Sequence, residues 1–427
     1  MDKDKETPKH DADGHESTPL PEAGLGFKLP ESNTAHGTSK PSVVAAKPLH
    51  NEALHSTEPD TKAKKTHGGL GGWIKHHRVA TALMIILLIA LITAGAVYAT
   101  RKPRELPKAG AETTSTPTPT PAPTKKASPL TGVEVDPAIA DQPVFASIIE
   151  NLVGTGNARP QSGLTSAGVV YEALSEGGIT RYLAVWQADV PTDIGPVRSL
   201  RPIFYDSAME YSAPVAHAGG STDGLALANS GQGFKDMDQF FNGSSFRRIT
   251  TRYAPHNLFS TGADLLKLVA AKGWNTVPTF TPWTRKDDAA SEAPNATTIT
   301  IDFSAPDYRA GFTYDKATNS YPRTIAGKPD LDQAAGLKQV TPKTVIVVYA
   351  GVAAGTQPNG KPKTDIDITG TGKGIIFQDG IATPMTWTKS GSTARMKFTN
   401  GEGKEIALNR GQSWVSYVPA NMPVTYK

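Results

Sequence analysis

Two arginines beside a predicted helix are the clearest sign of ligand chemistry in this sequence. They lie in Ile194-Gly-Pro-Val-Arg198-Ser-Leu-Arg201, and the apolar spacing from Arg198 to Tyr211 predicts a helix. Guanidinium groups one helical turn apart can face one ligand and hold a phosphate or carboxylate through paired hydrogen bonds. The alternative is that these arginines form structural ion pairs with Glu172, Glu176 or Asp206.

Short polar motifs on either side of these arginines supply further candidates. Arg159-Pro-Gln-Ser-Gly163 is a predicted turn between two apolar strands, and Glu172 and Glu176 lie near a strand end, before Gly177-Gly178-Ile-Thr-Arg181. Arg252-Tyr-Ala-Pro-His256-Asn257 is a predicted loop whose side chains could simply cap neighbouring backbone groups. The candidate ligand-binding residues are Arg159, Glu172, Glu176, Arg181, Arg198, Arg201, His217, Ser221, Asp223, Arg252, His256 and Asn257.

His217-Ala-Gly-Gly-Ser221 leaves a predicted strand and enters a turn, a place where ligands often bind in α/β sheets. His217 could act as a base, and the hydroxyl of Ser221 could bind a phosphate. A single histidine at a strand end is more often a hydrogen-bonded structural residue. A Ser–His–Asp triad could be assembled from Ser221, His217 or His256 and an aspartate, but the spacing does not require one. The catalytic residues therefore stay unknown.

Composition excludes several other classes of function. The chain has no cysteine, which excludes disulfides and thiol catalysis. Its formal net charge of +4, from 44 basic and 40 acidic side chains over 427 residues, does not predict nucleic-acid binding. Dinucleotide and P-loop phosphate motifs are absent, and most histidines fall in the N-terminal region. We therefore expect no cofactor and no metal.

The elements that must position the candidates form two segments. In 129–275, apolar runs at 144–149, 168–174 and 182–187 predict strands, and Thr261-x-x-Asp264 predicts a helix start. Strands alternating with helices predict an α/β domain. In 296–427, short apolar runs with turn signals at Asp379-Gly380 and Asn400-Gly401 predict a β-rich, barrel- or sandwich-like domain.

The first 128 residues predict an anchor and a spacer. Residues 79–100 carry no charge and are long enough to cross a bilayer as one transmembrane helix. Residues 1–72 have the composition of a disordered tail, and 101–128 form a Pro/Thr-rich stalk. Basic residues flank the span almost equally, so charge alone does not orient it. Because the stalk is typical of a spacer that lifts a domain from a surface, we place the N-terminus in the cytoplasm and the C-terminal domains outside.

Five motifs follow one another in 129–427: PLTG (129–132), ARPQSGL (158–164), IGPVRSLR (194–201), HAGGS (217–221) and LNRGQSWVSYVP (408–419). In this order they resemble the YerB-like family of bacterial envelope proteins of unknown function. The resemblance implies an extracytoplasmic location but no reaction. Members are commonly held by a lipid on an N-terminal cysteine, and this chain has the predicted transmembrane helix instead.

A fainter similarity links Thr180-Arg181, Ile194-Gly-Pro-Val-Arg198 and His217-Ala-Gly-Gly220 to the LytR-CpsA-Psr phosphotransferases. That similarity implies arginines that hold the diphosphate of a lipid-linked glycan. Tyr182 stands where that family has an acidic residue, which puts magnesium binding and transfer chemistry in doubt.

Three hypotheses of function follow. The chain is expected to be a single-pass membrane protein that binds an anionic cell-wall or lipid-linked ligand. Alternatively, it is an envelope enzyme that transfers or hydrolyses a phosphate-linked glycan, or a structural partner of a membrane complex. Arginines that converge in an open cleft would favour a ligand, and arginines neutralised in the core would favour the structural role.

Overall fold

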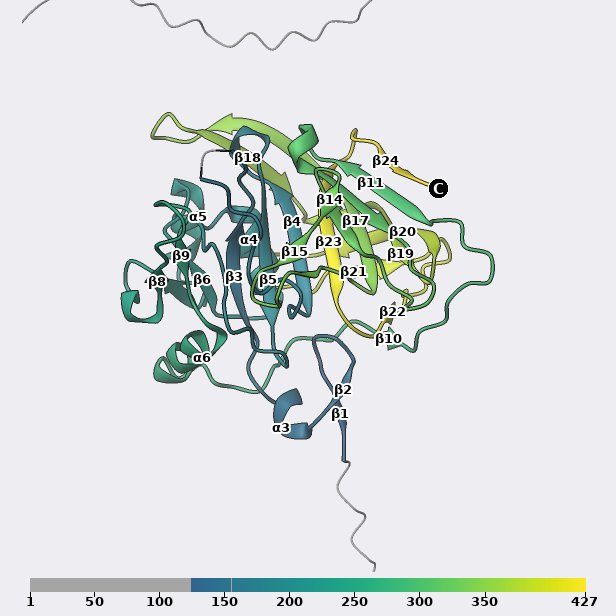
Figure 1. Cartoon of the computed structure of the whole chain (residues 1–427), viewed down its shortest axis with the longest axis horizontal. Coiled ribbons are helices and arrows are strands. Elements are labelled where there is room, and N and C mark those ends of the chain that lie inside the picture. The colour runs from purple at the N-terminus through teal and green to yellow at the C-terminus, as the bar shows by residue number, and fades with distance from the viewer. Residues whose placement is uncertain (1–123, 155) are drawn as a thin grey trace, which may run out of the picture. The chain divides into compact units, whose positions relative to one another are not determined.

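The computed structural model describes residues 124–154 and 156–427. The predicted tail, transmembrane helix and most of the stalk lie outside the described residues. Within those two ranges, no helix is long and apolar enough to cross a membrane. The described part is mostly β-structure with few helices (Figure 1). The helices are α3 (Pro137–Ala140), α4 (Pro202–Met209), α5 (Thr222–Ala228) and α6 (Gly262–Ala271).

One eleven-stranded sheet contains strands from both predicted segments. Figure 1 shows the join, where β23, near the C-terminus, lies beside β4 from the first segment. The two strands are parallel, with Trp414 opposite Val170. In spatial order the strands are β21 (Lys397–Thr399), β20 (Ile381–Lys389), β19 (Gly370–Gln378), β17 (Thr344–Thr356), β23 (Ser413–Pro419), β4 (Val169–Leu174), β5 (Thr180–Trp186), β3 (Phe145–Glu150), β6 (Val215–His217) and β7 (Asp236–Asp238), with β18 (Pro362–Asp367) paired to β17.

A five-stranded sheet and several short ladders complete the β-structure. In order, the five strands are β14 (Lys328–Pro329), β13 (Arg323–Ile325), β12 (Arg309–Thr313), β11 (Thr298–Asp302) and β24 (Val424–Tyr426). The short pairs are β1 (Lys126–Ala127) with β2 (Glu134–Val135), β8 (Arg247–Arg248) with β9 (Leu258–Phe259), β10 (Arg285–Lys286) with β22 (Leu408–Asn409), and β15 (Leu331–Asp332) with β16 (Lys338–Gln339).

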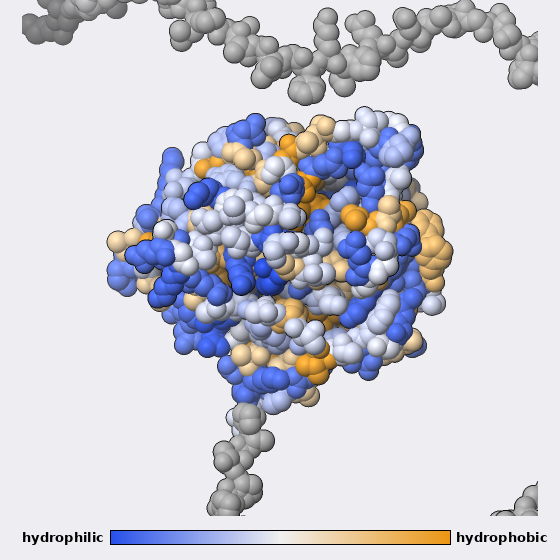
Figure 2. All heavy atoms as spheres, turned by 180° about the vertical axis from the view of Figure 1, so that it is seen from behind, coloured by the Kyte–Doolittle hydropathy of each residue, from blue (hydrophilic) through white to orange (hydrophobic). Residues whose placement is uncertain are grey.

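The central sheet is covered on both faces, which explains its continuous apolar runs. Successive side chains of a strand point to opposite faces. Ile346 and Val348 of β17 belong to the core under α4, whereas Val345 and Val347 belong to the core under α6 and the five-stranded sheet. In a strand that is buried on both faces, polar and apolar residues do not alternate, and the sequence is a continuous apolar run. On the face of the molecule drawn in Figure 2, the exposed surface is mainly hydrophilic.

The expected fold is confirmed in part. The three runs predicted as strands in the first segment form β3, β4 and β5, and Thr261 caps α6 by accepting a hydrogen bond from Asp264 N. β3, β4 and β5 pair antiparallel rather than as a parallel α/β sheet, so β-rich describes both segments. The second segment closes no barrel of its own, because four of its long strands extend the shared sheet.

Buried charges connect the two segments. Glu172 on β4 accepts hydrogen bonds from Arg323 Nη2 at 2.8 Å and from Trp414 Nε1 at 3.0 Å. Arg323 also pairs with Asp330, and its guanidinium carbon lies 4.3 Å from the centre of the Trp414 ring. The side chains of Glu172 and Arg323 are completely buried. Because ions lose their hydration when buried, such a pair is tolerated only with satisfied partners.

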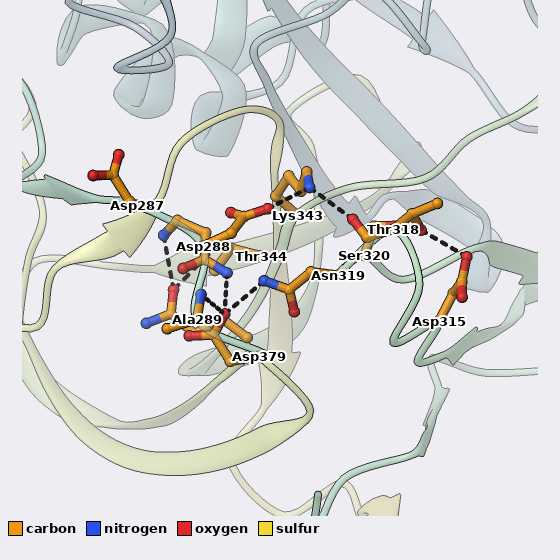
Figure 3. Close-up of polar contacts among 12 residues, drawn as sticks. Asp287, Asp288, Ala289, Asp315, Thr318, Asn319, Ser320, Lys343, Thr344 and Asp379 are labelled. Carbon is orange, nitrogen blue, oxygen red and sulfur yellow. Dashed lines mark hydrogen bonds and ion pairs between the residues drawn. The ribbon is translucent and has the colours of Figure 1, made fainter. Parts of the chain in front are cut away.

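A second polar centre holds the turn between β19 and β20 (Figure 3). Asp379 and Gly380 both have positive φ, 59° and 77°, as the predicted two-residue hairpin turn requires. The Asp379 carboxylate accepts hydrogen bonds from Lys286, Asn319 and Asn409, and from the backbone N–H of Ala289. Burial alone would raise the pKa of Asp379, but these hydrogen bonds outweigh it and the pKa lies below its ordinary value.

Replacing Arg323 with alanine is expected to lower the free energy of unfolding by about 3–5 kcal/mol, because Glu172 and Asp330 would stay buried without a cation. Urea denaturation measures the change. Replacing all three by apolar residues (Glu172→Met, Arg323→Met, Asp330→Leu) should destabilise less than Arg323→Ala alone. The control Arg309→Ala breaks an exposed pair with Asp302 and should stay within about 1 kcal/mol. An Arg323→Ala effect as small as the control's would contradict the prediction.

Asp379→Ala is expected to destabilise the protein more than Asp379→Asn, by about 1–3 kcal/mol. Asparagine tolerates the positive φ and keeps an acceptor oxygen, whereas alanine leaves the donors of Lys286, Asn319 and Asn409 without their partner. Thermal unfolding of both variants at one pH tests this order. Equal melting temperatures of the two variants would show that an acceptor oxygen at position 379 does not by itself hold the turn.

Candidate functional site

Arg181, Arg198 and Arg201 converge at one end of β3 and β5, and we name them the arginine cluster. Their side chains are 11%, 21% and 13% exposed, so each is largely covered but still reaches the surface. Two carboxylates lie among them, Glu150 and Glu176. Glu150 is the cross-strand partner of Arg181. The structure places these three arginines close to the same two carboxylates, and their role in binding a ligand stays a prediction.

The local backbone differs from the expected helix. α4 begins only at Pro202, and Arg201 precedes it in an extended conformation, with φ −132° and ψ 154°. Val197 and Leu200 form isolated bridges with Ile149 and Gly220, so the segment containing Arg198 runs along strand ends instead of coiling. The expected spacing of one helical turn is therefore wrong. The sheet, and not a helix face, brings the two guanidinium groups together.

Arg201 and Glu176 form a bidentate ion pair. Arg201 Nε and Nη2 lie 2.6 and 2.7 Å from the two oxygens of Glu176. Burial would raise the pKa of Glu176, but the hydrogen bonds and charge of Arg201 lower it to about 2. This is one of the structural pairs that the sequence left open. Arg198 pairs instead with Glu150, at 2.7 Å.

Arg181 is the cation without a carboxylate of its own. Its Nη1 lies 3.9 Å from Glu176, which Arg201 already occupies, and 3.5 Å from Ser199 O. Its Nε is buried without a hydrogen-bond partner among the described residues. Burial, followed by the charge of Arg201, lowers the pKa of Arg181 to about 9. Three guanidinium groups thus share two carboxylates, which leaves an excess of positive charge.

His256 joins the cluster through Glu150. Its Nδ1 lies 2.9 and 3.0 Å from the two carboxylate oxygens, and its ring is 12% exposed. Glu150 therefore holds both Arg198 and His256 in position. Sequence reasoning missed Glu150, which directly follows the predicted strand 144–149 and is the last residue of β3.

Glu172 is completely buried and Arg159 is half-buried, and one chain of hydrogen bonds connects them. Glu172 accepts a hydrogen bond from Thr180, which accepts one from Asn151. Arg159 Nε donates to the same Asn151 side chain at 2.7 Å. This chain leads to the buried Arg323, another residue that sequence reasoning missed. No local signal marked Arg323, because its partner lies 151 residues away.

His217 and Ser221 have structural partners. His217 is completely buried, with Nδ1 2.9 Å from Gly219 O and Nε2 3.1 Å from Asp236. Ser221 caps α5 by accepting a hydrogen bond from Gly224 N. The two side chains are not hydrogen-bonded to each other in the described part of the chain, which removes the simplest triad. Both ring nitrogens of His217 therefore have a partner within the protein, as expected for a structural histidine.

The remaining candidates also contact the protein itself. Asp223 pairs with Lys363 at 3.1 Å, and Arg252 donates to Ala158 O and Pro160 O. Asn257 accepts a hydrogen bond from Arg248 and donates to the carbonyl of Ile249. These contacts hold loops around the arginine cluster in place.

A hairpin from the second segment borders the cluster. β17 extends past the sheet to Thr356 and pairs with β18, and this hairpin contacts α5 and the loop before β5. Gln357 accepts a hydrogen bond from Thr222 N, and Thr364 donates one to Ser175 O. Ser175 in turn donates to Glu176 at 2.8 Å. The surroundings of the cluster therefore come from both segments.

Comparisons with known proteins agree on one family. Residues 130–275 match the family described as "Protein of unknown function (DUF3048) N-terminal domain", and residues 299–415 match its C-terminal domain. The Bacillus subtilis (strain 168) protein described as "Putative lipoprotein YerB" is 29% identical over 298 residues, which are 69% of this chain and 87% of that protein.

A solved structure supports the same relationship. The crystal structure of YerB protein from Bacillus subtilis superimposes with a TM-score of 0.63 at 27% identity, covering 70% of this chain and 100% of that chain. The two family models match residues in both predicted segments, and the resemblance drawn from the sequence motifs is confirmed. This chain belongs to the DUF3048 family, and YerB is its relative in sequence and in fold.

Proposed function

We propose that this chain is an extracytoplasmic protein of the cell envelope that binds an anionic envelope ligand at the arginine cluster. It is held by the apolar segment 79–100, with the N-terminus in the cytoplasm and residues 129–427 outside. A relative that carries the name of a lipoprotein supports a position at the outer surface of a membrane.

The observation that carries the proposal is the excess charge at Arg181. Structural ion pairing accounts for Arg198 with Glu150 and for Arg201 with Glu176. It leaves Arg181 with a shared carboxylate at 3.9 Å and an unpaired Nε. A buried cation near other cations is unfavourable unless an anion completes the site. Phosphate and carboxylate oxygens match the donors that guanidinium groups present.

The substitution Arg181→Met tests this directly. It removes the surplus cation and leaves both ion pairs intact, so we expect unfolding stability to stay equal or rise. Native mass spectrometry of the full-length chain, extracted from its own membranes, should show an anionic adduct in the wild type that is absent from Arg181→Met. Arg309→Met is the matched control, because it removes an exposed arginine on β12, in the five-stranded sheet. The same bare mass for wild type and variant would contradict ligand binding, and a marked loss of stability in Arg181→Met would favour a purely structural cluster.

The Glu176–Arg201 pair should make stability depend on pH in a defined window. The folded pKa of about 2 is below the ordinary value of 4.5, so the stabilisation is present above about pH 4.5 and is lost as pH falls towards 2. Because Glu176 is partly solvated, we expect about 1–2 kcal/mol. Wild type and Glu176→Gln should differ by that amount in urea at pH 7, and the difference should shrink below pH 4.5 and be largely lost at about pH 2. A constant difference across this range would disprove the pH dependence.

A further inference from the structure

A cavity of about 730 Å³ lies beside the ends of β20 and β21, lined by residues 281–284 and by residues of the second segment. Its volume is within the range of roughly 300–1,000 Å³ that small-molecule sites occupy. The lining shares no residue with the arginine cluster. Six of its residues carry the argument: Trp283, Thr388, Lys389, Ser390, Arg395 and Lys397.

Two buried cations form one wall of this cavity. The side chains of Lys389 and Arg395 are 0% and 7% exposed, and both pair with one completely buried carboxylate, Glu210, at 3.2 and 2.8 Å. Lys389 also donates to Ser392 O and Ala394 O. Two cations on one carboxylate leave an excess of positive charge.

The other charged groups near this wall do not remove the excess. Asp206 lies near Lys389 as a second carboxylate, and burial raises its pKa. Arg285 adds a third cation, which is half-buried and whose hydrogen bonds all go to neutral oxygens, those of Leu130, Asn409, Gly411 and Ser413. The exposed Lys397 also lines the cavity, as does one carboxylate, Glu405, which accepts hydrogen bonds from Thr284.

The positively charged wall is rigid and combined with hydroxyl groups. The guanidinium carbon of Arg395 lies 3.6 Å from the centre of the Trp283 ring and 4.2 Å from that of Tyr211, so the group is held between two rings. Thr281, Thr388 and Ser390 line the cavity, and their hydroxyls make no hydrogen bond within the described residues. A hydroxyl can both donate and accept, as the hydroxyls of a sugar do.

We propose that this cavity is a second binding site, for a hydroxyl-bearing small anion with the chemistry of a sugar phosphate or a sugar carboxylate. The oxyanion would lie against Arg395 and Lys397, and the ligand's hydroxyls would meet Thr388 and Ser390. The site is separate from the arginine cluster and does not depend on the function proposed there.

Calorimetric titration of the full-length chain in detergent tests the site with four probes: N-acetylglucosamine 1-phosphate, glucuronate, N-acetylglucosamine and inorganic phosphate. We expect at least one charged sugar to bind about tenfold or more tightly than the neutral sugar and than phosphate alone. The first two probes distinguish a phosphate source from a carboxylate source. No saturation by either charged sugar would overturn the proposal. If the neutral sugar bound as tightly as the charged sugars, the claim that the site selects an anion would be overturned. If inorganic phosphate bound as tightly, the claim that the site recognises a sugar would be overturned.

Variants locate the binding without disturbing the buried ion pairs. Lys397→Glu reverses an exposed charge at the cavity and should weaken binding of the charged sugar about tenfold or more. Lys404→Glu makes the same charge change on an exposed turn outside the lining and should leave affinity unchanged. Arg181→Met should also leave it unchanged, which separates this site from the arginine cluster. Equal losses in Lys397→Glu and Lys404→Glu would indicate a general charge effect and overturn the assignment.

Discussion

The parallel pairing of β23 with β4 is the constraint on which the rest of the described structure depends. β23 lies between β17 and β4, so the last long strand of the chain joins two sets of strands that are far apart in sequence. Parallel neighbours need long connections, and here the connection is most of the chain. Both hydrophobic cores pass continuously across this join.

The buried charges beside this join give it a definite register. Glu172 on β4 meets Trp414 on β23 and Arg323 on β13, so three distant strands must be correctly placed for one carboxylate to be satisfied. A slip of one residue would turn Glu172 to the other face and leave Arg323 unpaired. Such an ion pair adds little net stability, since desolvation offsets attraction, but a wrong arrangement is strongly disfavoured. We infer that this network of buried charges mainly determines how the two segments are arranged, and adds little to the stability of that arrangement.

Both proposed sites share one electrostatic feature, a group of covered cations with fewer carboxylates than positive charges. At the arginine cluster the surplus falls on Arg181, and at the second cavity it falls on the pair Lys389 and Arg395. A purely structural role would require only that each arginine is paired with a carboxylate. An incomplete set instead leaves a positive potential that an incoming oxyanion can stabilise. The sites differ in shape, because the second one has a cavity with free hydroxyl groups beside the charge.

The sequence by itself determined the local features of this protein. Apolar runs predicted β3, β4 and β5, because each buries both faces, and Asp379-Gly380 predicted its turn through the φ values that it requires. The family was also legible from the order of its motifs. Only the tertiary structure decided which strands pair and which charges meet. Arg198 pairs with Glu150, 48 residues away, and Glu172 with Arg323, because the order of strands in the shared sheet brings them together. The hydrophobic periodicity of a segment indicates which of its faces are buried, but not which other segment packs against it. The ion-pair partners of these residues therefore could not be predicted from periodicity.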